Sequence, residues 1–361
     1  MSEYFDLIIV GAGMAGASLA AEAGAGKRVL LIEAEERPGY HTTGRSAAFW
    51  SESYGGPGVQ PLTTASGPVL NTLGLLSPRQ ALTLGRSADR PRVQAFAEQY
   101  DAIGVEMIFL ERSGLDEFVP GLRPEWECGV LEPSCCDIDV AGLHQHYLRK
   151  ARLAGAELRC RAGLAAAERT PQGWSVLLSD GTRATCAVLA NAAGAWADEV
   201  AKLAGVRPLG ITPYRRTMAQ LRVAPKAPAT LPLVMDIDET FYFKPEGGGL
   251  WLSPHDETPS VPCDAAPDEL DVAIAISRME EVVDWQIERL EHRWAGLRSF
   301  APDRLPVYGF ADDEPGFFWF AGQGGFGIQT APAAAQLGAQ LLRGDAGGPI
   351  DPAPYSPARF A

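Results

Sequence analysis

Three glycines and one acid near the amino terminus have the types and spacing needed to hold a phosphorylated ligand. Gly11, Gly13 and Gly16 form a G-x-G-x-x-G pattern, and Glu33 follows Gly13 by 20 residues. The first glycine of such a pattern permits a tight turn, the second lets the backbone approach a pyrophosphate, and the third allows close packing of a helix. The acid accepts hydrogen bonds from a ribose diol. The spacing predicts dinucleotide binding, because a mere glycine-rich surface turn would not explain it.

The elements that must position this turn lie on both sides of it. Residues 6–10 are an apolar run typical of a buried parallel strand, an alanine-rich helix is expected to about Gly24, and residues 29–32 form a second apolar run. A helix that starts at the turn directs its free amides toward the phosphates. We therefore expect a strand, turn, helix and strand unit that ends in Glu33.

A second glycine-rich turn lies at the far end of the chain. An aromatic strand is expected over residues 317–321, the sequence GQGGFG follows, and a helix is expected over residues 328–342. A helix start near Gly327 carries a partial positive charge, which would stabilise a reduced flavin at its pyrimidine edge. Since a nicotinamide enzyme does not need this second turn, the pair of turns favours FAD over NAD.

The segment after Glu33 combines small hydroxyls with an arginine. The segment consists of Thr42, Thr43, Gly44, Arg45 and Ser46. We expect these residues to make a second contact with the diphosphate of the cofactor, or else to form a capped surface loop. Residues 47–57 are aromatic and then rich in glycine. This pattern indicates either a mobile lid hinged at Gly55 and Gly56 or a packed loop.

The composition is that of a globular protein with one large or two interleaved domains: 361 residues, 46% hydrophobic and 21% charged. The formal net charge of −14 argues against nucleic acid or an anionic membrane as the main partner. The first strand begins within five residues, so we expect no signal peptide and a cytoplasmic protein, with a peripheral position at the inner membrane left open. No apolar run is long enough to span a bilayer.

The cysteines have no spacing typical of a zinc site, so we expect no metal. There are six of them: Cys128, Cys135, Cys136, Cys160, Cys186 and Cys263. Free thiols are expected in a reducing compartment. The adjacent Cys135 and Cys136 could form a strained disulfide, and the role of this pair is left open.

Five motifs occur in the following order over almost the whole chain: the amino-terminal glycine pattern, HTTGRSAA, NAAGAW, WAGLRSF and GQGGFGIQT. Together they resemble the D-amino-acid oxidase/dehydrogenase (DAO) superfamily of FAD-dependent oxidoreductases. Within it, the sequence is most similar to bacterial D-arginine dehydrogenase-like D-amino acid dehydrogenases. The resemblance implies an α/β (α+β) fold. A Rossmann-like FAD domain would comprise residues 1–75, 137–212 and 290–361, and an interleaved antiparallel-sheet substrate domain residues 76–136 and 213–289.

The resemblance also implies site residues at the matching positions. Beside the glycine pattern, FAD would contact Ala15, Glu33, Ala34, Thr42, Thr43, Gly44, Arg45, Ser46, Ala47, Ala48, Phe49, Leu164, Gly324, Gly325, Phe326, Gly327, Ile328 and Gln329. The substrate would contact Tyr54, Arg216, Tyr242, Arg298 and Gly325.

These residue types suit an amino acid. A guanidinium and a phenol, such as Arg298 and Tyr242, bind a carboxylate well, and Arg216 and Tyr54 would close the site. The implied reaction is hydride transfer from the α-carbon to flavin N5, followed by hydrolysis to a 2-oxo acid and ammonia. It needs no protein nucleophile and no metal, and we assign no catalytic role to His41 or His255, which fall near the expected site loops.

Two positions depart from the D-arginine dehydrogenase pattern. Ala81 replaces an acid that pairs with the substrate guanidinium, and Phe49 replaces a histidine beside the flavin. With Leu233 and Met235 expected nearby, we predict a preference for apolar or aromatic D-amino acids over D-arginine. The last cysteine, Cys263, precedes the WAGLRSF motif, so we expect FAD to be bound non-covalently.

Other functions remain open at this level. The electron acceptor could be a quinone or another carrier, or oxygen, in a D-amino acid, glycine or sarcosine oxidase. An FAD-dependent 2-hydroxy acid dehydrogenase and a flavin-binding assembly subunit without turnover are further alternatives. The oligomeric state is not predicted.

Overall fold

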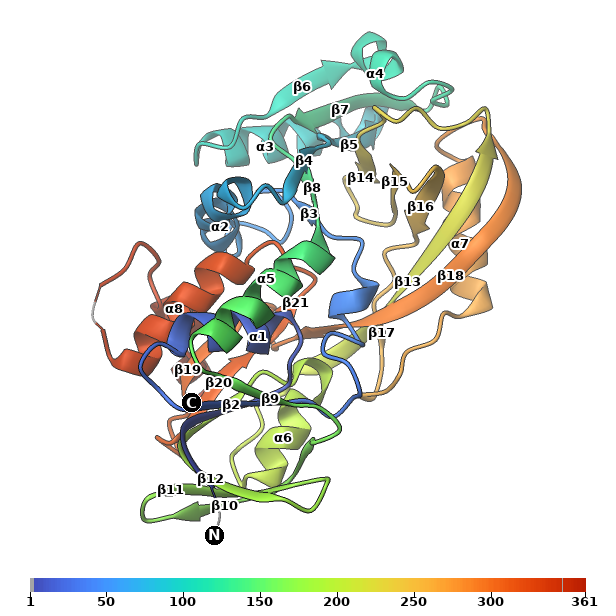
Figure 1. Cartoon of the computed structure of the whole chain (residues 1–361). Coiled ribbons are helices and arrows are strands. Elements are labelled where there is room, and N and C mark those ends of the chain that lie inside the picture. The colour runs from blue at the N-terminus through green and yellow to red at the C-terminus, as the bar shows by residue number, and fades with distance from the viewer. Residues whose placement is uncertain (1–2, 346) are drawn as a thin grey trace.

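Two large sheets, visited alternately by the chain, form the body of the protein in a computed structural model that describes residues 3–345 and 347–361. The first sheet, with both chain termini near it, fills the lower part of Figure 1, and the second lies above and to the right. This mixed α/β organisation is the predicted fold class.

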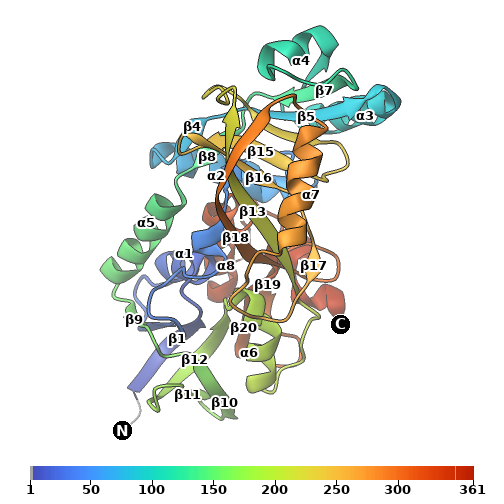
Figure 2. The same ribbon diagram turned by 90° about the vertical axis from the view of Figure 1, so that its right-hand side faces the viewer.

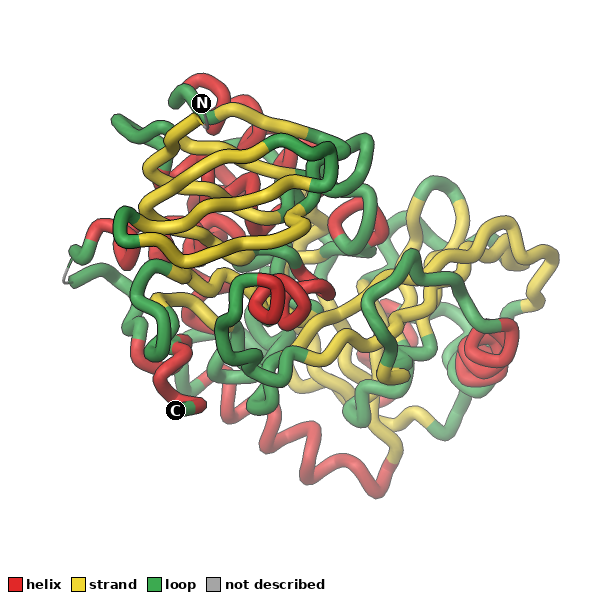
Figure 3. Tube along the Cα trace, turned by 90° about the horizontal axis from the view of Figure 1, so that it is seen from below, coloured by secondary structure: helices red, strands yellow, loops and turns green. Residues whose placement is uncertain are grey.

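The first sheet has eight strands around a parallel centre. β1 runs parallel to β2 and β12, and the parallel pairing continues through β9 and β20. In spatial order the strands are β10 (Leu164–Thr170), β11 (Gly173–Leu178), β12 (Arg183–Asn191), β1 (Glu3–Val10), β2 (Val29–Ile32) and β9 (Glu157–Arg159), with β20 (Phe317–Ala321) and β19 (Val307–Phe310) joined beside β12. Figure 3 shows these strands side by side from below. The predicted parallel strand at the amino terminus is confirmed.

Helices cover both faces of this sheet, which explains the continuous apolar run of residues 7–10 in β1. Leu7 and Ile9 pack with buried residues of α1 (Met14–Ala23), α5 (Val140–Leu153) and α8 (Ala331–Arg343). Ile8 and Val10 belong to a second buried cluster that includes α6 (Ala197–Leu203). Successive side chains of a strand point to opposite faces, so a strand covered on both sides must be apolar throughout.

The second sheet has ten strands and is mostly antiparallel, with one parallel pair between β14 and β5. In spatial order its strands are β21 (Gln323–Gly324), β18 (Gln286–Phe300), β13 (Thr212–Ala224), β16 (Gly249–Ser253), β15 (Tyr242–Glu246), β14 (Leu233–Asp236), β5 (Ala81–Arg86), β7 (Trp126–Glu132) and β6 (Ile108–Glu111), with β17 (Thr258–Pro259) paired to β13. Its core includes residues of α4 (Arg112–Phe118) and α7 (Glu269–Glu280), while α3 (Arg90–Asp101) packs against β5 and β7. Figure 2 shows α7 along β13 and β18.

A small third sheet joins the two large ones. It contains β3 (Phe49–Trp50), β8 (Cys136–Ile138) and β4 (Leu76–Pro78). Between β3 and β4 lies α2 (Gln60–Thr72), a helix that the sequence did not predict. Pro68 inside the helix lowers its intrinsic propensity, and it is stabilised by tertiary contact with α8, where Ser66 Oγ accepts a hydrogen bond from the Ala333 amide.

Several predicted boundaries differ from the structure. Residues 325–330 form turns, and α8 begins only at Ala331, where Pro332 occupies the first helical turn. The expectation of a helix start near Gly327 is therefore wrong. The expected helix over residues 267–287 ends at Glu280, and β18 begins at Gln286. The proposed domain boundary at residue 290 falls inside this strand.

The three glycines of the amino-terminal turn have different roles, and this is testable in cofactor-free protein. A methyl group on Gly16 would lie 1.8 Å from the Gly11 carbonyl oxygen, whereas one on Gly13 would meet only Thr43 Oγ1, at 3.2 Å. Gly16→Ala should therefore lower the free energy of unfolding by about 1–3 kcal/mol, and Gly13→Ala should change it much less. Urea unfolding measures both, and equal losses would contradict the assignment.

Candidate active site

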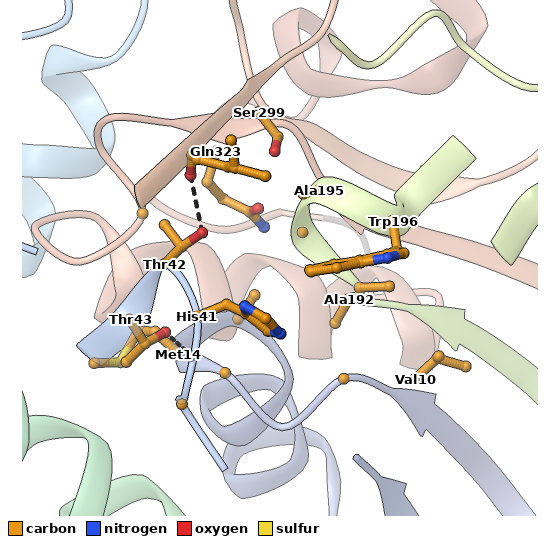
Figure 4. A pocket seen from close by; sticks show the side chains of 18 of the residues that line it. Val10, Met14, His41, Thr42, Thr43, Ala192, Ala195, Trp196, Ser299 and Gln323 are labelled. Carbon is orange, nitrogen blue, oxygen red and sulfur yellow. Dashed lines mark hydrogen bonds between the residues drawn. The ribbon is translucent and has the colours of Figure 1, made fainter. Parts of the chain in front are cut away.

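A cavity of about 400 Å³ lies where the amino-terminal turn, the end of β2, strand β18 and the second glycine-rich turn meet. Figure 4 shows part of its lining. Most of the residues predicted to contact FAD line it: Gly11, Gly13, Ala15, Glu33, Ala34, Thr42, Thr43, Ser46, Leu164, Gly324, Gly325, Gly327 and Ile328. Segments from both ends of the chain thus meet in one place.

Hydrogen bonds fix the amino-terminal part of this cavity. The Glu33 carboxylate accepts from the amides of Ala12 and Glu35, both at 3.0 Å. Each of its oxygens keeps a lone pair for a ligand hydroxyl. Thr43 Oγ1 accepts from the Met14 amide at 2.9 Å, and Thr42 Oγ1 donates to the Leu297 carbonyl at 2.8 Å. The polar segment after Glu33 therefore lies against both the first turn of α1 and strand β18.

Some walls of the cavity were not among the predicted contacts. Trp196, which follows β12, and His41 face each other with their ring centroids 4.7 Å apart. The small-residue turn NAAGAW was a usable signal for Trp196, because it follows a parallel strand as the first glycine turn does. The signal for His41 was its place at the start of the HTTGRSAA motif, directly before the predicted contacts Thr42 and Thr43.

Arg45 has a different environment from the one expected, and it does not line this cavity. Its guanidinium pairs with Asp264 and donates to the carbonyls of Ala265 and Ala295. The arginine thus joins its segment to the loop before α7 and to β18. Also outside the larger cavity are Gly16, Gly44, Ala47, Ala48, Phe49, Phe326 and Gln329.

A second, small cavity of about 20 Å³ lies beside the first and shares Ser46, Arg298, Gly325 and Ile328 with it. Its other lining residues are Ala47, Ala48, Phe49, Tyr54, Tyr242 and Gln329. The structure therefore brings four of the five predicted substrate contacts together. Arg216 lines neither cavity.

Arg298 is a buried cation without a counter-ion. Its side chain is 6% exposed, its Nη1 has no hydrogen-bond partner, and it forms no ion pair within the part of the chain that the structure describes. Burial lowers the pKa of the guanidinium, but an arginine remains charged in proteins. Beside it, the Tyr242 hydroxyl contacts only Met218 Sδ, a weak acceptor, at 3.1 Å. Both groups are suited to bind an anion.

Tyr54 and His255 form a hydrogen-bonded pair at the small cavity. The Tyr54 hydroxyl lies 3.4 Å from His255 Nε2, and His255 Nδ1 lies 2.5 Å from the Glu239 carbonyl oxygen. Burial, reinforced by Arg216, lowers the pKa of His255 to about 3, so its ring is neutral. The carbonyl assigns the proton to Nδ1, which leaves Nε2 to accept from Tyr54. Burial also raises the pKa of Tyr54, so its hydroxyl remains a donor.

Arg216 is buried outside the small cavity and is bound by Asp256 and Glu257. It is 2% exposed, its Nε donates to the Asp256 carbonyl at 2.9 Å, and its Nη2 pairs with Glu257 at 3.2 Å. Its Nη1 is buried without a partner among residues 3–345 and 347–361. Its field still reaches Tyr54 and His255.

An apolar cluster adjoins the small cavity, to which it contributes the lining residues Ala47, Phe49, Tyr54 and Tyr242. Phe49, Ala81 and Leu233 are buried in one cluster with Tyr242, and Met235 packs against it. Ala81 and Phe49, the two positions that depart from the D-arginine dehydrogenase pattern, thus lie in the same cluster. A separate wide groove contains Lys244 and Arg79, but both are paired with Asp137, so we assign no ligand to it.

The lining of the larger cavity fits FAD rather than a metal. It contains the amino-terminal end of α1, with its free backbone amides, and the carboxylate of Glu33, which can bind a ribose. At Gly13 the absence of a Cβ lets a ligand approach the backbone. Within the described ranges no group of three metal-ligating side chains is present, and all six cysteines are free thiols. No helix there is long and apolar enough to cross a membrane.

Known proteins agree with this fit. The chain is 27% identical over 392 residues to glycine oxidase of Pseudomonas aeruginosa, with 98% of each chain covered. It is 26% identical over 275 residues to hydrogen cyanide synthase subunit HcnC of the same species, which covers 75% of this chain and 64% of that subunit. Thus the match spans slightly less than two thirds of the subunit.

The fold is also that of solved flavoenzymes. L-proline dehydrogenase from P. horikoshii superposes with a TM-score of 0.87 at 20% identity, covering 100% of this chain and 98% of that one. The sequence pattern of the FAD dependent oxidoreductase (DAO) family matches residues 6–341. The predicted superfamily and FAD dependence are confirmed. The chain belongs to the DAO family of FAD-dependent oxidoreductases.

Proposed function

We propose that the protein oxidises the α-carbon of apolar D-amino acids, giving a 2-oxo acid and ammonia. The observation that carries this proposal is the buried guanidinium of Arg298, which has no counter-ion in the described chain and lies on the wall shared by the two cavities. Removing an unpaired charge from water is costly. An amino acid carboxylate would supply the missing anion next to the FAD site.

The residues around the small cavity have distinct roles in this proposal. Arg298 and the Tyr242 hydroxyl bind the carboxylate, and Tyr54 donates to the substrate or to neutral His255. Bound FAD would accept a hydride from the substrate α-carbon. The protein contributes orientation and exclusion of water, since none of the described residues that line the small cavity is a cysteine, lysine, histidine, aspartate or glutamate.

The side-chain preference follows from the apolar cluster. Ala81, Phe49 and Leu233 offer no acid to a basic side chain, and the positive charge of Arg298 and Arg216 repels one. The D configuration is supported by the motif resemblance alone. A second candidate, oxidation of glycine or a small secondary amine, is supported by the small size of the cavity, about 20 Å³, and by the glycine oxidase relative.

A quinone or another carrier is the proposed electron acceptor.

Anaerobic flavin reduction tests the substrate class. D-leucine and D-phenylalanine should bleach the flavin absorbance faster than D-arginine, because the cavity lacks an acid for the guanidinium. L-enantiomers, glycine and sarcosine serve as the comparison set. Faster reduction by D-arginine would overturn the apolar preference, and reduction by glycine alone would favour the second candidate. Oxygen uptake during turnover would identify oxygen as the acceptor.

Arg298→Leu should raise KM for the amino acid strongly. Loss of a charge-assisted bidentate pair is worth about 2–4 kcal/mol, or roughly 30- to 1000-fold in affinity. The matched control is Arg293→Leu on the same strand, because Arg293 is 42% exposed and pairs with Glu269 at the surface. Steady-state kinetics of both variants decide the point, and an unchanged KM in Arg298→Leu would refute the carboxylate role.

FAD should dissociate completely when the holoprotein is denatured. No cysteine lines either cavity, and Cys263 lies in the loop before α7. Acid precipitation should therefore leave all the flavin absorbance in the supernatant. Flavin that remains on the precipitated chain after washing would contradict non-covalent binding.

A further inference from the structure

The segment between β3 and α2 covers the small cavity. The Tyr54 hydroxyl lies 3.0 Å from the place that a Cβ on Gly325 would occupy, and the Tyr54 ring contacts Phe49 and Phe326 with centroids 5.0 and 5.1 Å away. Gly55 and Gly56 follow with φ angles of +103° and +81°, a conformation that favours glycine. The chain thus makes a tight turn directly over the site.

One side of this segment is attached to Gln329, in the turns that follow the second glycine-rich turn. Gln329 Oε1 accepts from the Ser51 amide at 3.3 Å, and its Nε2 donates to the Tyr54 carbonyl at 3.0 Å. These are bonds between neutral groups, which contribute about 0.5–1.5 kcal/mol each.

The other side is attached to the ten-stranded sheet through Glu132, the last residue of β7. Its carboxylate accepts from Ser51 Oγ at 2.8 Å, from the Glu52 amide at 2.6 Å and from Ser53 Oγ at 2.5 Å. The Tyr100 hydroxyl of α3 adds a bond to the Ser53 carbonyl at 2.8 Å. Three consecutive residues of the segment thus bind one carboxylate.

Glu132 has no cation to balance it. It is 2% exposed and forms no ion pair within the described part of the chain. Apart from a long contact from Ser134 at 3.4 Å, its acceptor sites are filled by the segment itself. A buried carboxylate that loses its donors is left uncompensated, at a larger cost than the loss of neutral bonds. Burial raises its pKa, while the bonds from Ser53, Ser51 and the Glu52 amide lower it.

We propose that Glu132 is a positioning residue that holds residues 51–54 closed over the small cavity and thereby places the Tyr54 hydroxyl at the substrate. Because one carboxylate receives all three bonds, they break together, and the segment opens as a unit when substrate enters. The identity of the molecule admitted rests on the proposed function, whereas the closed segment does not.

We call the bonds from residues 51–53 to the Glu132 carboxylate the latch. Hydrogen exchange of the FAD-loaded protein tests the latch without any substrate. In Glu132→Gln, amides of residues 51–56 should exchange at least fivefold faster than in the parent protein, because a neutral amide side chain accepts fewer and weaker bonds. The matched control is Glu111→Gln on the neighbouring strand β6, whose carboxylate is 63% exposed and pairs with Arg90. It removes the same charge from the same sheet and should leave this exchange unchanged.

Unchanged exchange in a folded, FAD-loaded Glu132→Gln variant would overturn the proposal. If that variant does not retain FAD, Ser53→Ala removes one of the same bonds from the other side, and its exchange rate then decides whether the latch exists. The double variant should exchange no faster than Glu132→Gln alone, since the two residues share a bond. Additive effects would count against the latch.

Kinetics with D-leucine connect the latch to the reaction. Glu132→Gln should raise KM about tenfold and change kcat less than threefold, because Tyr54 would be misplaced while FAD and Arg298 stay in position. A merely structural defect would lower the content of folded enzyme without changing KM. If the parent protein fails to oxidise any amino acid, the proposed function fails, and the exchange experiment still decides the role of Glu132.

Discussion

The site depends on the pairing of β18 with its two neighbours. β18 pairs with β13 along its whole length, from Gln286 opposite Ala224 to Phe300 opposite Thr212. At its end Ser299 pairs with Gly324 of β21. The strand therefore belongs to the ten-stranded sheet over its whole length and ends beside the larger cavity. This continuity places Arg298 on the wall between the two cavities and holds the second glycine-rich turn next to it.

Two buried side chains of opposite charge are associated with the small cavity, Arg298 in its lining and Glu132 through the residues before Tyr54, and neither has a charged partner in the described chain. Arg298 lacks an anion, and Glu132 is balanced only by donors from residues 51–54. An unpaired buried charge is expensive in a medium of low polarity. In each case the compensation comes from a part that is expected to move: the substrate for the arginine and the covering segment for the glutamate.

The specificity of the site is set by side chains rather than by the fold. Relatives with this architecture are named for glycine, for L-proline and for hydrogen cyanide synthesis, so the arrangement of sheets does not select one substrate. In this chain Phe49, Tyr242 and Arg298 line the small cavity, and Ala81 lies in the same buried cluster as Phe49. The neutral His255 adds an acceptor for Tyr54 without adding charge.

The sequence alone determined the parts of this protein whose geometry is local. The turn at Gly11, Gly13 and Gly16 and the acid at Glu33 were predictable because a strand, turn and helix within 30 residues fix their own relative positions. Motifs that resemble a known family also located Arg298 and Tyr242. Only the tertiary structure decided the bonds of Glu132, His255 and Arg45 and the contact of His41 with Trp196, because these partners lie far away in the chain and no local pattern encodes the contacts. The same holds for α2, where contact with α8 outweighs the low helix propensity of Pro68.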